Sequence, residues 1–398
     1  MTGVLAESII VEQGACYRSC NHKDETMDFD AIVIGAGVIG LAAGAELAEA
    51  HLRTGIIEKN QKYGLETSSR NSEVIHSGIH YPSGSLKSQL CVEGNALLYE
   101  IAEKHNIYHA RIGKLTIARD LSEIPILESL VKQAKQNEIP GVEMIPGAKV
   151  GDMVPGISVY PAIYTPTTGI INAHQLMDYL VFRFKNAGGL MACGEKVIAV
   201  GSVQDGYRVS TTSGSESLTC RILINCAGLY ADEIAAIFGI HIPVHWAKGD
   251  YYSVLRSMPS RLLIYPVPSR NALGIHITPK LEGGIRIGPD IEYVQKKYPP
   301  YPCDEPSAFT VDETKKEVFI REIQGFLPGI RQEDLVPEMY GIRPKLQGPS
   351  DDFRDFLIRD EKESGFPGFI NLIGIESPGL TSCIAIGRYV KNIVRDML

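Results

Sequence analysis

The fold of this chain is decided by residues 30–40, which read Asp-Ala-Ile-Val-Ile-Gly-Ala-Gly-Val-Ile-Gly. The apolar, β-branched first half predicts a buried parallel strand, and the run at 41–50 predicts a helix directly after the glycines. Gly35 allows the tight turn, Gly37 lets a phosphate approach the backbone because it has no Cβ, and Gly40 lets the helix pack on the strand. This unit predicts a site where a pyrophosphate meets a helix N-terminus.

An acidic residue follows at the distance that a dinucleotide site requires. The apolar strand at 54–57 ends in Glu58, about 20 residues after the last glycine. A carboxylate there can accept hydrogen bonds from both hydroxyls of an adenosine ribose, whereas an NADP site more often offers a basic residue. A glycine-rich turn without a ligand is the alternative, but it does not explain why strand, glycine spacing, helix and acid agree.

The composition limits the class of protein. The chain has 398 residues, of which 44% are hydrophobic, and a formal net charge of −8, which predicts a soluble globular protein with two packed units. The acidic balance argues against nucleic acid as a main partner. The sequence contains no run of 18 apolar residues, so we expect no transmembrane segment, while peripheral membrane contact stays open.

The eight cysteines show no CxxC pair and no Cys/His spacing typical of a metal site. Most of them lie in apolar stretches and are interpreted as reduced core thiols, Cys226 included. We therefore expect no metal and a reducing, cytoplasmic location. Residues 1–27 are predicted to be a tail, because the apolar patch at 8–11 is too short for a signal peptide. Either the tail is disordered, or the native chain starts at Met27, which N-terminal sequencing would decide.

Polar side chains gather after the second strand. Hydroxyl and amide groups cluster at 67–72, where they can bind phosphate oxygens or present backbone amides to a flat polar ring. His76, His80 and Tyr81 follow within a few residues. A lone histidine is more often structural, but the density of polar residues behind a nucleotide motif favours binding or catalysis.

Taken together, these motifs resemble the D-amino-acid-oxidase-type FAD-dependent oxidoreductases, and most closely their L-2-hydroxyglutarate dehydrogenase/oxidase branch. The resemblance runs through nearly the whole chain from residue 28. It rests on the segments 35–40, 58, 67–79, 84–87, 168–172, 225–232, 248–252, 264–268 and 273–279. It implies FAD rather than NAD, a distinction that the glycine spacing alone does not make.

The resemblance implies an α/β fold with a FAD-binding Rossmann-like domain and a discontinuous α+β substrate domain built on an antiparallel sheet. The predicted FAD-binding domain comprises 28–90, 150–236 and 336–398. The predicted substrate-binding domain comprises 91–149 and 237–335. Helices are predicted at 95–105, 124–136 and 172–186, and a strand at 114–118.

The residues expected to bind FAD are spread over the chain. By resemblance, Val197 meets the adenine, and the segment 375–381 opens a helix whose N-terminus stabilises negative charge on the reduced flavin. The full set is Gly35, Gly37, Val38, Ile39, Gly40, Glu58, Lys59, Thr67, Ser68, Arg70, Asn71, Ser72, His76, Ser77, Gly78, Val197, Ala227, Gly228, Gly341, Arg343, Gly374, Glu376, Ser377, Pro378, Gly379, Leu380 and Thr381.

The second group of candidates concerns the substrate. Arg343 is expected to bind a carboxylate, because the planar guanidinium donates two parallel hydrogen bonds; pairing with a protein carboxylate is the alternative. One of three histidines is expected to accept a hydroxyl proton as a neutral base. Lys248 and the tyrosines are expected to bind an acidic substrate. The candidates are His76, His80, His276, Arg343, Lys248, Tyr252 and Tyr265.

The predicted activity is FAD-dependent oxidation of a small 2-hydroxy acid, similar to L-2-hydroxyglutarate, to the 2-keto acid by hydride transfer to flavin N5. Oxygen and a quinone are both open as electron acceptors. In the animal dehydrogenases of that branch small residues occupy the positions of Glu73 and Pro344, so the substrate stays open. The alternatives are an amino-acid or amine oxidase acting on glycine or sarcosine, a glycerol-3-phosphate dehydrogenase, and a non-catalytic FAD-binding module.

Overall fold

The structure is a computed structural model and describes residues 27–214, 217–255, 261–268, 274–302 and 307–397. The predicted tail, apart from Met27, lies outside the described residues together with Cys16, Cys20 and Cys303. The two hypotheses about the tail therefore stay predictions.

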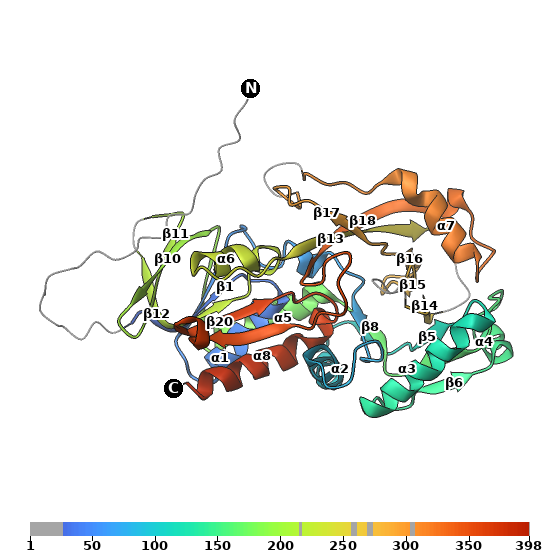
Figure 1. The fold of residues 1–398 in the computed structure, drawn as a ribbon, viewed down its shortest axis with the longest axis horizontal. Helices are drawn as coiled ribbons and strands as arrows, with labels where there is room; N and C mark the ends of the chain where they lie inside the picture. Colours follow the sequence, from blue (N-terminus) through green and yellow to red (C-terminus); the bar gives the residue numbers. More distant parts are fainter. Residues whose placement is uncertain (1–26, 215–216, 256–260, 269–273, 303–306, 398) are drawn as a thin grey trace, which may run out of the picture.

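The glycine-rich turn of 35–40 lies in a layer built on an eight-stranded sheet (Figure 1). Parallel pairing joins the strands β1 (Phe29–Ile34), β2 (Thr54–Glu58), β9 (Leu190–Cys193), β12 (Leu218–Asn225) and β20 (Phe366–Ile373). The antiparallel strands are β10 (Val197–Val203), β11 (Gly206–Thr211) and β19 (Leu357–Glu361). The middle of β1 is fully buried because helices cover the sheet.

Helices of this layer pack around α1 (Val38–Glu49). Its neighbours are α5 (Ala173–Asn186) and α8 (Gly379–Arg395), and α2 (Leu86–Lys104) packs against α8, while α6 (Ala231–Ile237) lies on the other side of the sheet (Figure 1). Close approach requires glycines. A Cβ on Gly40 would lie 1.9 Å from the Gly35 oxygen, and one on Gly387 would lie 2.7 Å from the Ala42 oxygen.

The second layer is a sheet of nine strands that pair mostly in antiparallel fashion. Its strands run in the order β17 (Glu292–Val294), β13 (His245–Val254), β16 (Ile285–Ile287), β15 (Ile277–Pro279), β14 (Leu263–Pro266), β5 (Lys114–Ile117), β7 (Ala162–Thr165) and β6 (Glu143–Ile145), and β18 (Leu335–Lys345) pairs with β13. Only β14 and β5 pair in parallel among these described strands.

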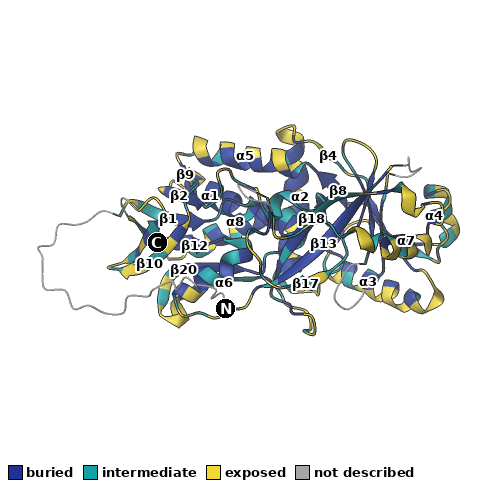
Figure 2. Ribbon diagram, turned by 90° about the horizontal axis from the view of Figure 1, so that it is seen from above, coloured by how far each residue is buried: buried dark blue, intermediate teal, exposed yellow. Residues whose placement is uncertain are grey.

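Three helices and a small sheet complete the fold. The helices α3 (Ile124–Gln136), α4 (Gly147–Met153) and α7 (Lys316–Gln324) accompany the second sheet. The strands β3 (Val74–Ile75), β8 (Gly169–Ile171) and β4 (His109–Ala110) form a three-stranded sheet between the two layers (Figure 1). Figure 2 shows that buried residues follow the strands of both sheets and the inner sides of the helices.

The predicted fold class is confirmed: the fold is α/β, with parallel and antiparallel sheets. The predicted helix at 124–136 coincides with α3, and the strand at 114–118 corresponds to β5. The predicted helix at 95–105 is only the second half of α2, which begins earlier because the Ser85 hydroxyl caps it and accepts the Ser88 N–H (3.1 Å).

The predicted domain boundaries stay a prediction, and two elements cross them. α2 packs on α8 in the first layer, although most of it falls in the predicted segment 91–149. β18 pairs with β13 in the second layer, although it falls almost wholly in the predicted segment 336–398.

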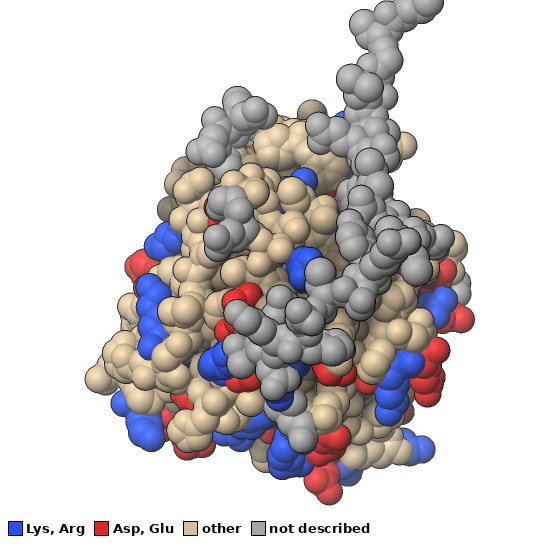
Figure 3. Space-filling view, turned by 90° about the vertical axis from the view of Figure 1, so that its left-hand side faces the viewer, with Lys and Arg blue, Asp and Glu red and all other residues tan. Residues whose placement is uncertain are grey.

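The visible surface carries charges of both signs, and the described cysteines form no disulfide. On the face shown in Figure 3, acidic and basic side chains are interspersed. Within the described ranges, no helix is both long and apolar enough to cross a bilayer, and no group of three or more His, Cys, Asp or Glu could hold a metal. The described cysteines are free thiols, and most are buried; they are Cys91, Cys193, Cys220, Cys226 and Cys383.

Candidate functional site

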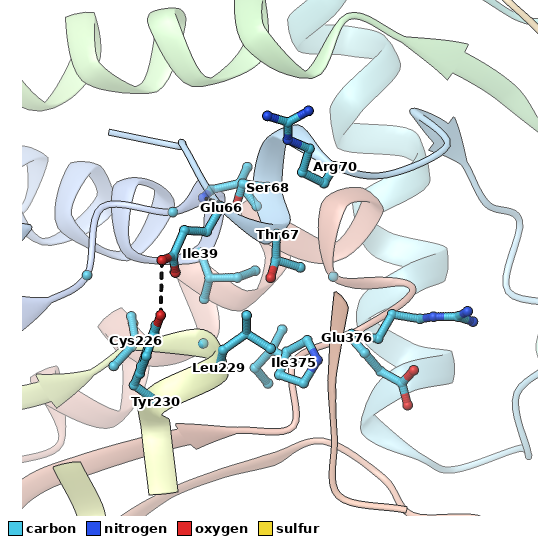
Figure 4. A pocket seen from close by; sticks show the side chains of 18 of the residues that line it. Ile39, Glu66, Thr67, Ser68, Arg70, Cys226, Leu229, Tyr230, Ile375 and Glu376 are labelled. Carbon is cyan, nitrogen blue, oxygen red and sulfur yellow. Dashed lines mark hydrogen bonds between the residues drawn. The ribbon is translucent and has the colours of Figure 1, made fainter. Parts of the chain in front are cut away.

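A cavity of about 1660 Å³ lies where the two layers meet. It is larger than a typical small-ligand pocket, which measures about 300–1,000 Å³. The turn after β1, the 3-10 helix η1 (Thr67–Ser69), β18 and the start of α8 contribute to its wall. In Figure 4 the side chains of Ile39, Leu229 and Ile375 approach one another across this space, while Glu376 lies further along.

The glycine-rich turn leaves bare backbone along one part of the wall. Gly35 has φ +100°, and a Cβ there would lie 2.6 Å from the Cys226 oxygen; a Cβ on Gly37 would lie 3.0 Å from Ser68 Oγ. The Val38 N–H donates to Ser68 Oγ (2.9 Å). The N-cap residue of α1 is Gly37, which has no side chain to occupy the next N–H groups, and the first turn of the helix holds no acidic residue. Free N–H groups and the positive dipole end therefore suit a phosphate.

Glu58 is held rigidly at the end of β2. Its Oε2 accepts the Ala36 N–H (2.8 Å), and its Oε1 accepts the N–H (2.8 Å) and the Nδ2–H (2.9 Å) of Asn60. Burial raises its pKa, although these bonds oppose the shift. The carboxylate keeps lone pairs for a ligand hydroxyl and lines the cavity.

A further group of residues closes the wall near Glu58. Glu66 Oε1 accepts a hydrogen bond from the Tyr230 hydroxyl (3.2 Å), as Figure 4 shows. It also accepts one from Lys59 Nζ (2.5 Å), which lies 3.7 Å from the centre of the Tyr230 ring. The sequence pattern predicted Lys59 but missed Glu66 and Tyr230. No spacing signal could reveal a pair that lies 164 residues apart.

Around the start of α8, a buried carboxylate holds two lysines. Glu376 pairs with Lys345 Nζ (2.7 Å) and with Lys87 Nζ (3.1 Å). Although burial opposes it, the charges of the two lysines lower the pKa of Glu376 to about 2. Thr381 connects α8 to β3, because its hydroxyl accepts the His76 N–H (3.0 Å) and donates to the Val74 oxygen (3.2 Å).

Most of the residues predicted to bind FAD line this one cavity, Val197, Ala227, Gly228 and Gly341 included. Five of them lie behind its wall and do not reach it. They are Gly40, Ser77, Gly78, Gly374 and Thr381. Gly40 and Thr381 instead fix the helices that carry the wall.

The three candidate histidines differ in their partners. His76 Nε2 lies 3.3 Å from Ser377 Oγ, and His80 Nε2 lies 2.9 Å from Lys114 Nζ. His276 Nδ1 donates to the Gly274 oxygen (2.9 Å), and its buried Nε2 meets no partner in the part of the chain that the structure describes. His76 and His276 line the cavity, whereas His80 lies behind it.

Loss of hydration keeps these imidazoles neutral. Burial, followed by the charge of Lys114, lowers the pKa of His76 to about 3. Burial likewise lowers the pKa of His276 to about 3, with smaller effects of Arg343 and Lys114, and holds that of His80 well below its usual value. Because His276 Nδ1 carries a proton and donates it to a carbonyl oxygen, the basic lone pair of the neutral ring is on Nε2.

Arg343 lines the cavity, and its guanidinium group has N–H donors left for a ligand. It stands opposite Ala247 in the pairing of β13 with β18, and its NH2 group donates to the Asp290 oxygen (2.5 Å). No carboxylate of the described residues forms an ion pair with it. A Cβ on Gly249 would come within 2.7 Å of this NH2 group, so glycine makes the approach possible.

Strand alternation separates the remaining candidates. Tyr265 lines the cavity, and its ring stacks on His276 (3.8 Å between centres, 17°). Lys248 and Tyr252 do not reach the cavity: Lys248 pairs with Asp250 (2.5 Å), and the Tyr252 hydroxyl donates to the Asp312 oxygen (2.5 Å).

The alternation of side chains along β13 explains why Lys248 and Tyr252 do not reach the cavity. Gly249 and Tyr251 line the cavity, so their neighbours along the strand point away from it. The sequence missed Tyr251, whose hydroxyl lies 3.2 Å from Ser72 Oγ. Alternation within 248–252 was visible in the sequence, but not which face meets the cavity.

Known proteins match this chain over nearly its whole length. Residues 30–393 match the family model described as FAD dependent oxidoreductase. The mitochondrial L-2-hydroxyglutarate dehydrogenase of Arabidopsis thaliana is 36% identical, covering 91% of this chain and 83% of that protein. The glycerol 3-phosphate dehydrogenase of Caloramator mitchellensis is 30% identical, covering 93% of this chain and 74% of that protein.

Solved structures share the fold. The L-alpha-glycerophosphate oxidase from Mycoplasma pneumoniae with FAD bound superposes with a TM-score of 0.79 at 21% identity, covering 92% of this chain and 94% of that one. The glycine oxidase from Geobacillus kaustophilus gives 0.77 at 21% identity, covering 94% and 96%.

Proposed function

This chain belongs to the family of FAD-dependent oxidoreductases, and we propose that it oxidises a small 2-hydroxy acid of the L-2-hydroxyglutarate type to the 2-keto acid. One observation carries the proposal: Arg343 has no carboxylate partner and neutral His276 has a free Nε2 among the described residues, and both side chains line the same cavity. The first suits a carboxylate, and the second suits a hydroxyl proton.

The residues of the cavity fit FAD. A Cβ at position 37 would crowd Ser68, and the glycine found there leaves the backbone uncovered. The pyrophosphate can therefore approach the N–H groups at the start of α1. Glu58 supports binding of the ribose, and the buried Nε of Arg70, which has no partner within the described segments, adds a donor in the wall. When bound, FAD supplies the acceptor for a hydride, and the protein positions the substrate.

Arg343 is proposed to bind the carboxylate of the substrate. Its guanidinium carries five N–H donors in a rigid fork, and the Asp290 oxygen is the acceptor seen for its NH2 group. Two parallel hydrogen bonds fix the plane of a carboxylate and therefore the direction of the neighbouring C2–H bond.

His276 is proposed to be the base. As the electron pair of the C2–H bond leaves, the hydroxyl proton moves to His276 Nε2 and the C2=O double bond forms. The Gly274 oxygen accepts the Nδ1–H of the ring, so the basic lone pair of the neutral imidazole is on Nε2. His76 is the second candidate; its Nε2 already lies 3.3 Å from the Ser377 hydroxyl.

The relatives support the substrate class without fixing it. The Arabidopsis thaliana relative is named for L-2-hydroxyglutarate, and the Caloramator mitchellensis relative, at lower identity, is named for glycerol 3-phosphate. The proposed partners are a small carboxylate and, as electron acceptor, oxygen or a quinone. The proposed location is the cytoplasm, although the Arabidopsis thaliana relative is named as mitochondrial.

The test is anaerobic mixing of the FAD-loaded protein with candidate substrates while the visible absorption of the flavin is followed. L-2-hydroxyglutarate is expected to bleach the flavin rapidly, whereas glycine, sarcosine, other amino acids and glycerol 3-phosphate leave it oxidised. Bleaching by glycerol 3-phosphate or an amino acid, with none by any 2-hydroxy acid, would overturn the proposal.

A further inference from the structure

Lys114 is a fully buried lysine behind the substrate end of the cavity. Its residue exposure is 0% at the start of β5, and its Nζ lies 2.9 Å from His80 Nε2 and 5.0 Å from the centre of the Tyr265 ring. The other groups that face it are His76, Cys91 on α2 and His276. None of these groups carries a negative charge at neutral pH.

Other buried cations of this region have a carboxylate partner. Lys248 pairs with Asp250 (2.5 Å), and Arg286 pairs with Glu338 (2.6 Å); Glu376 pairs with both lysines beside it. Lys114 makes no such pair with any carboxylate that the structure describes. Burying an ammonium group without a counter-ion is unfavourable. When Lys114 is protonated, no carboxylate of the described residues balances its charge.

Arg343 likewise forms no ion pair with a carboxylate of the described residues, and both cations influence His276. Both lie near enough to His276 to lower its pKa. Tyr265, whose ring centre lies 5.0 Å from Lys114 Nζ, and His276, stacked on it, line the cavity, whereas Lys114 does not reach it. A ligand beside Tyr265 and His276 can therefore contact the guanidinium of Arg343 directly. It interacts with the ammonium group of Lys114 only at a distance, through protein of low dielectric constant, where Coulomb interactions are weakly screened.

We propose that Lys114, held by His80, is a specificity-determining residue that supplies the positive charge for the second carboxylate of a dianionic 2-hydroxy acid whose first carboxylate binds Arg343. This inference rests on the proposed function and deepens it, because it assigns the residue that favours a dicarboxylate such as L-2-hydroxyglutarate over a monocarboxylate. Lys114 acts through the Tyr265–His276 wall and is a positioning residue, not a catalytic one.

Proton uptake follows from this arrangement. Burial lowers the pKa of Lys114 to about 7, so part of the protein carries a neutral amine at neutral pH and most of it does so above. A dianion favours the ammonium form and raises this pKa on binding, so a proton moves from solvent to Nζ. Dicarboxylate affinity should therefore fall as the pH rises above about 7, and monocarboxylate affinity should change less.

The experiment titrates FAD-loaded protein with 2-oxoglutarate and with pyruvate in a calorimeter at about pH 8, in two buffers of different ionisation enthalpy. The wild-type protein is expected to take up close to one proton per 2-oxoglutarate and markedly less per pyruvate. Lys114→Met should abolish the uptake and weaken 2-oxoglutarate about 10- to 50-fold, while pyruvate weakens less than about threefold.

Two controls separate charge from structure. Lys149→Met, at an exposed lysine, should change neither ligand. FAD content and Tm check the fold of Lys114→Met, because this substitution also removes the hydrogen-bond partner of His80 Nε2; a lysine needed only for folding would lower Tm and weaken both ligands alike. The wild-type affinities alone, followed between about pH 6 and 9, keep the test valid should the variant fold poorly.

The outcomes distinguish the two proposals. If wild-type protein binds 2-oxoglutarate with proton uptake that Lys114→Met leaves unchanged, or if both ligands weaken equally, the role of Lys114 is wrong and the proposed function stands. If 2-oxoglutarate does not bind at all and no 2-hydroxy acid bleaches the flavin, both are wrong.

Discussion

The two ends of the cavity are built in opposite ways. At the nucleotide end, Glu58 is fixed by three hydrogen bonds from Ala36 and Asn60, and Glu66 is fixed by Lys59 and Tyr230. At the substrate end, His276 Nε2 has no partner in the described residues, and Arg343 has no carboxylate.

This difference shows how one cavity serves two purposes. A cofactor that stays bound is best held by groups whose positions the protein has already fixed, since preorganisation reduces the cost of binding. A substrate that must react needs groups whose interactions are completed only when it arrives, because these are the interactions that can favour the transition state.

The largest effect is expected from His276→Gln, which removes the proposed base but keeps a polar side chain. The rate of flavin reduction by L-2-hydroxyglutarate should fall about 10²- to 10⁴-fold, while the FAD content stays unchanged. Stopped-flow absorbance measures the rate. His174→Gln, at an exposed histidine of α5, is the matched control and should behave as wild type. Equal rates for His276→Gln and the control would move the base to His76.

Arg343→Ala should lower kcat/KM for the 2-hydroxy acid about 10²- to 10³-fold, because a buried carboxylate would lose its charged hydrogen bonds. Arg343→Lys should recover only part of this loss, since a point charge cannot reproduce the bidentate fork. Steady-state kinetics with an artificial electron acceptor measures the effect. A fall in FAD content with no change in kcat/KM per bound flavin would reassign Arg343 to the cofactor.

Between the two ends, Glu376 should contribute to stability in a pH-dependent way. Its folded pKa is about 2 against an ordinary 4.5, so its contribution of about 3 kcal/mol is present above pH 4.5 and is lost as the pH falls toward 2. Urea unfolding followed by the fluorescence of Trp246, the single tryptophan, measures this. Glu376→Gln should lose a similar amount at neutral pH, and its stability should vary less with acid; a wild-type-like acid profile would contradict the assignment.

The smallest effect is expected from Glu58→Gln, which keeps one acceptor, for Ala36, but removes the charge and the oxygen that accepts from Asn60. FAD affinity should weaken about tenfold, and the reduction rate at saturating FAD should be unchanged. Burial raises the pKa of Glu58. As the pH is lowered, the affinity of the wild-type protein for FAD should therefore begin to fall at a higher pH than an ordinary glutamate would give. Fluorescence titration of the apoprotein with FAD measures both, and an unchanged affinity would show that no ribose hydroxyl binds there.

The same contrast governs what the sequence could predict. The nucleotide end follows from local rules, because glycine spacing and a strand-terminal acid determine the positions of Gly37 and Glu58. The substrate end depends on how distant strands meet. Lys248 and Tyr252 were predicted to face the substrate, but β13 turns them away and brings Tyr251 to the cavity instead.

Distance along the chain explains the remaining misses. Lys114 was seen only as the first residue of a strand, because its partners His80, Tyr265 and His276 come from three other segments. Glu66 and Tyr230 likewise meet only in the folded chain. A family resemblance suggested Arg343 and His276, while their free donors and acceptors became visible only with their neighbours in place.

The most direct test of this division of labour measures FAD content and anaerobic bleaching by L-2-hydroxyglutarate side by side in Glu58→Gln and Arg343→Ala. Glu58→Gln is expected to lose FAD on dilution but to bleach at the wild-type rate once saturated with FAD. Arg343→Ala is expected to retain FAD and to bleach far more slowly. If each variant instead loses both properties together, the two ends of the cavity do not act separately.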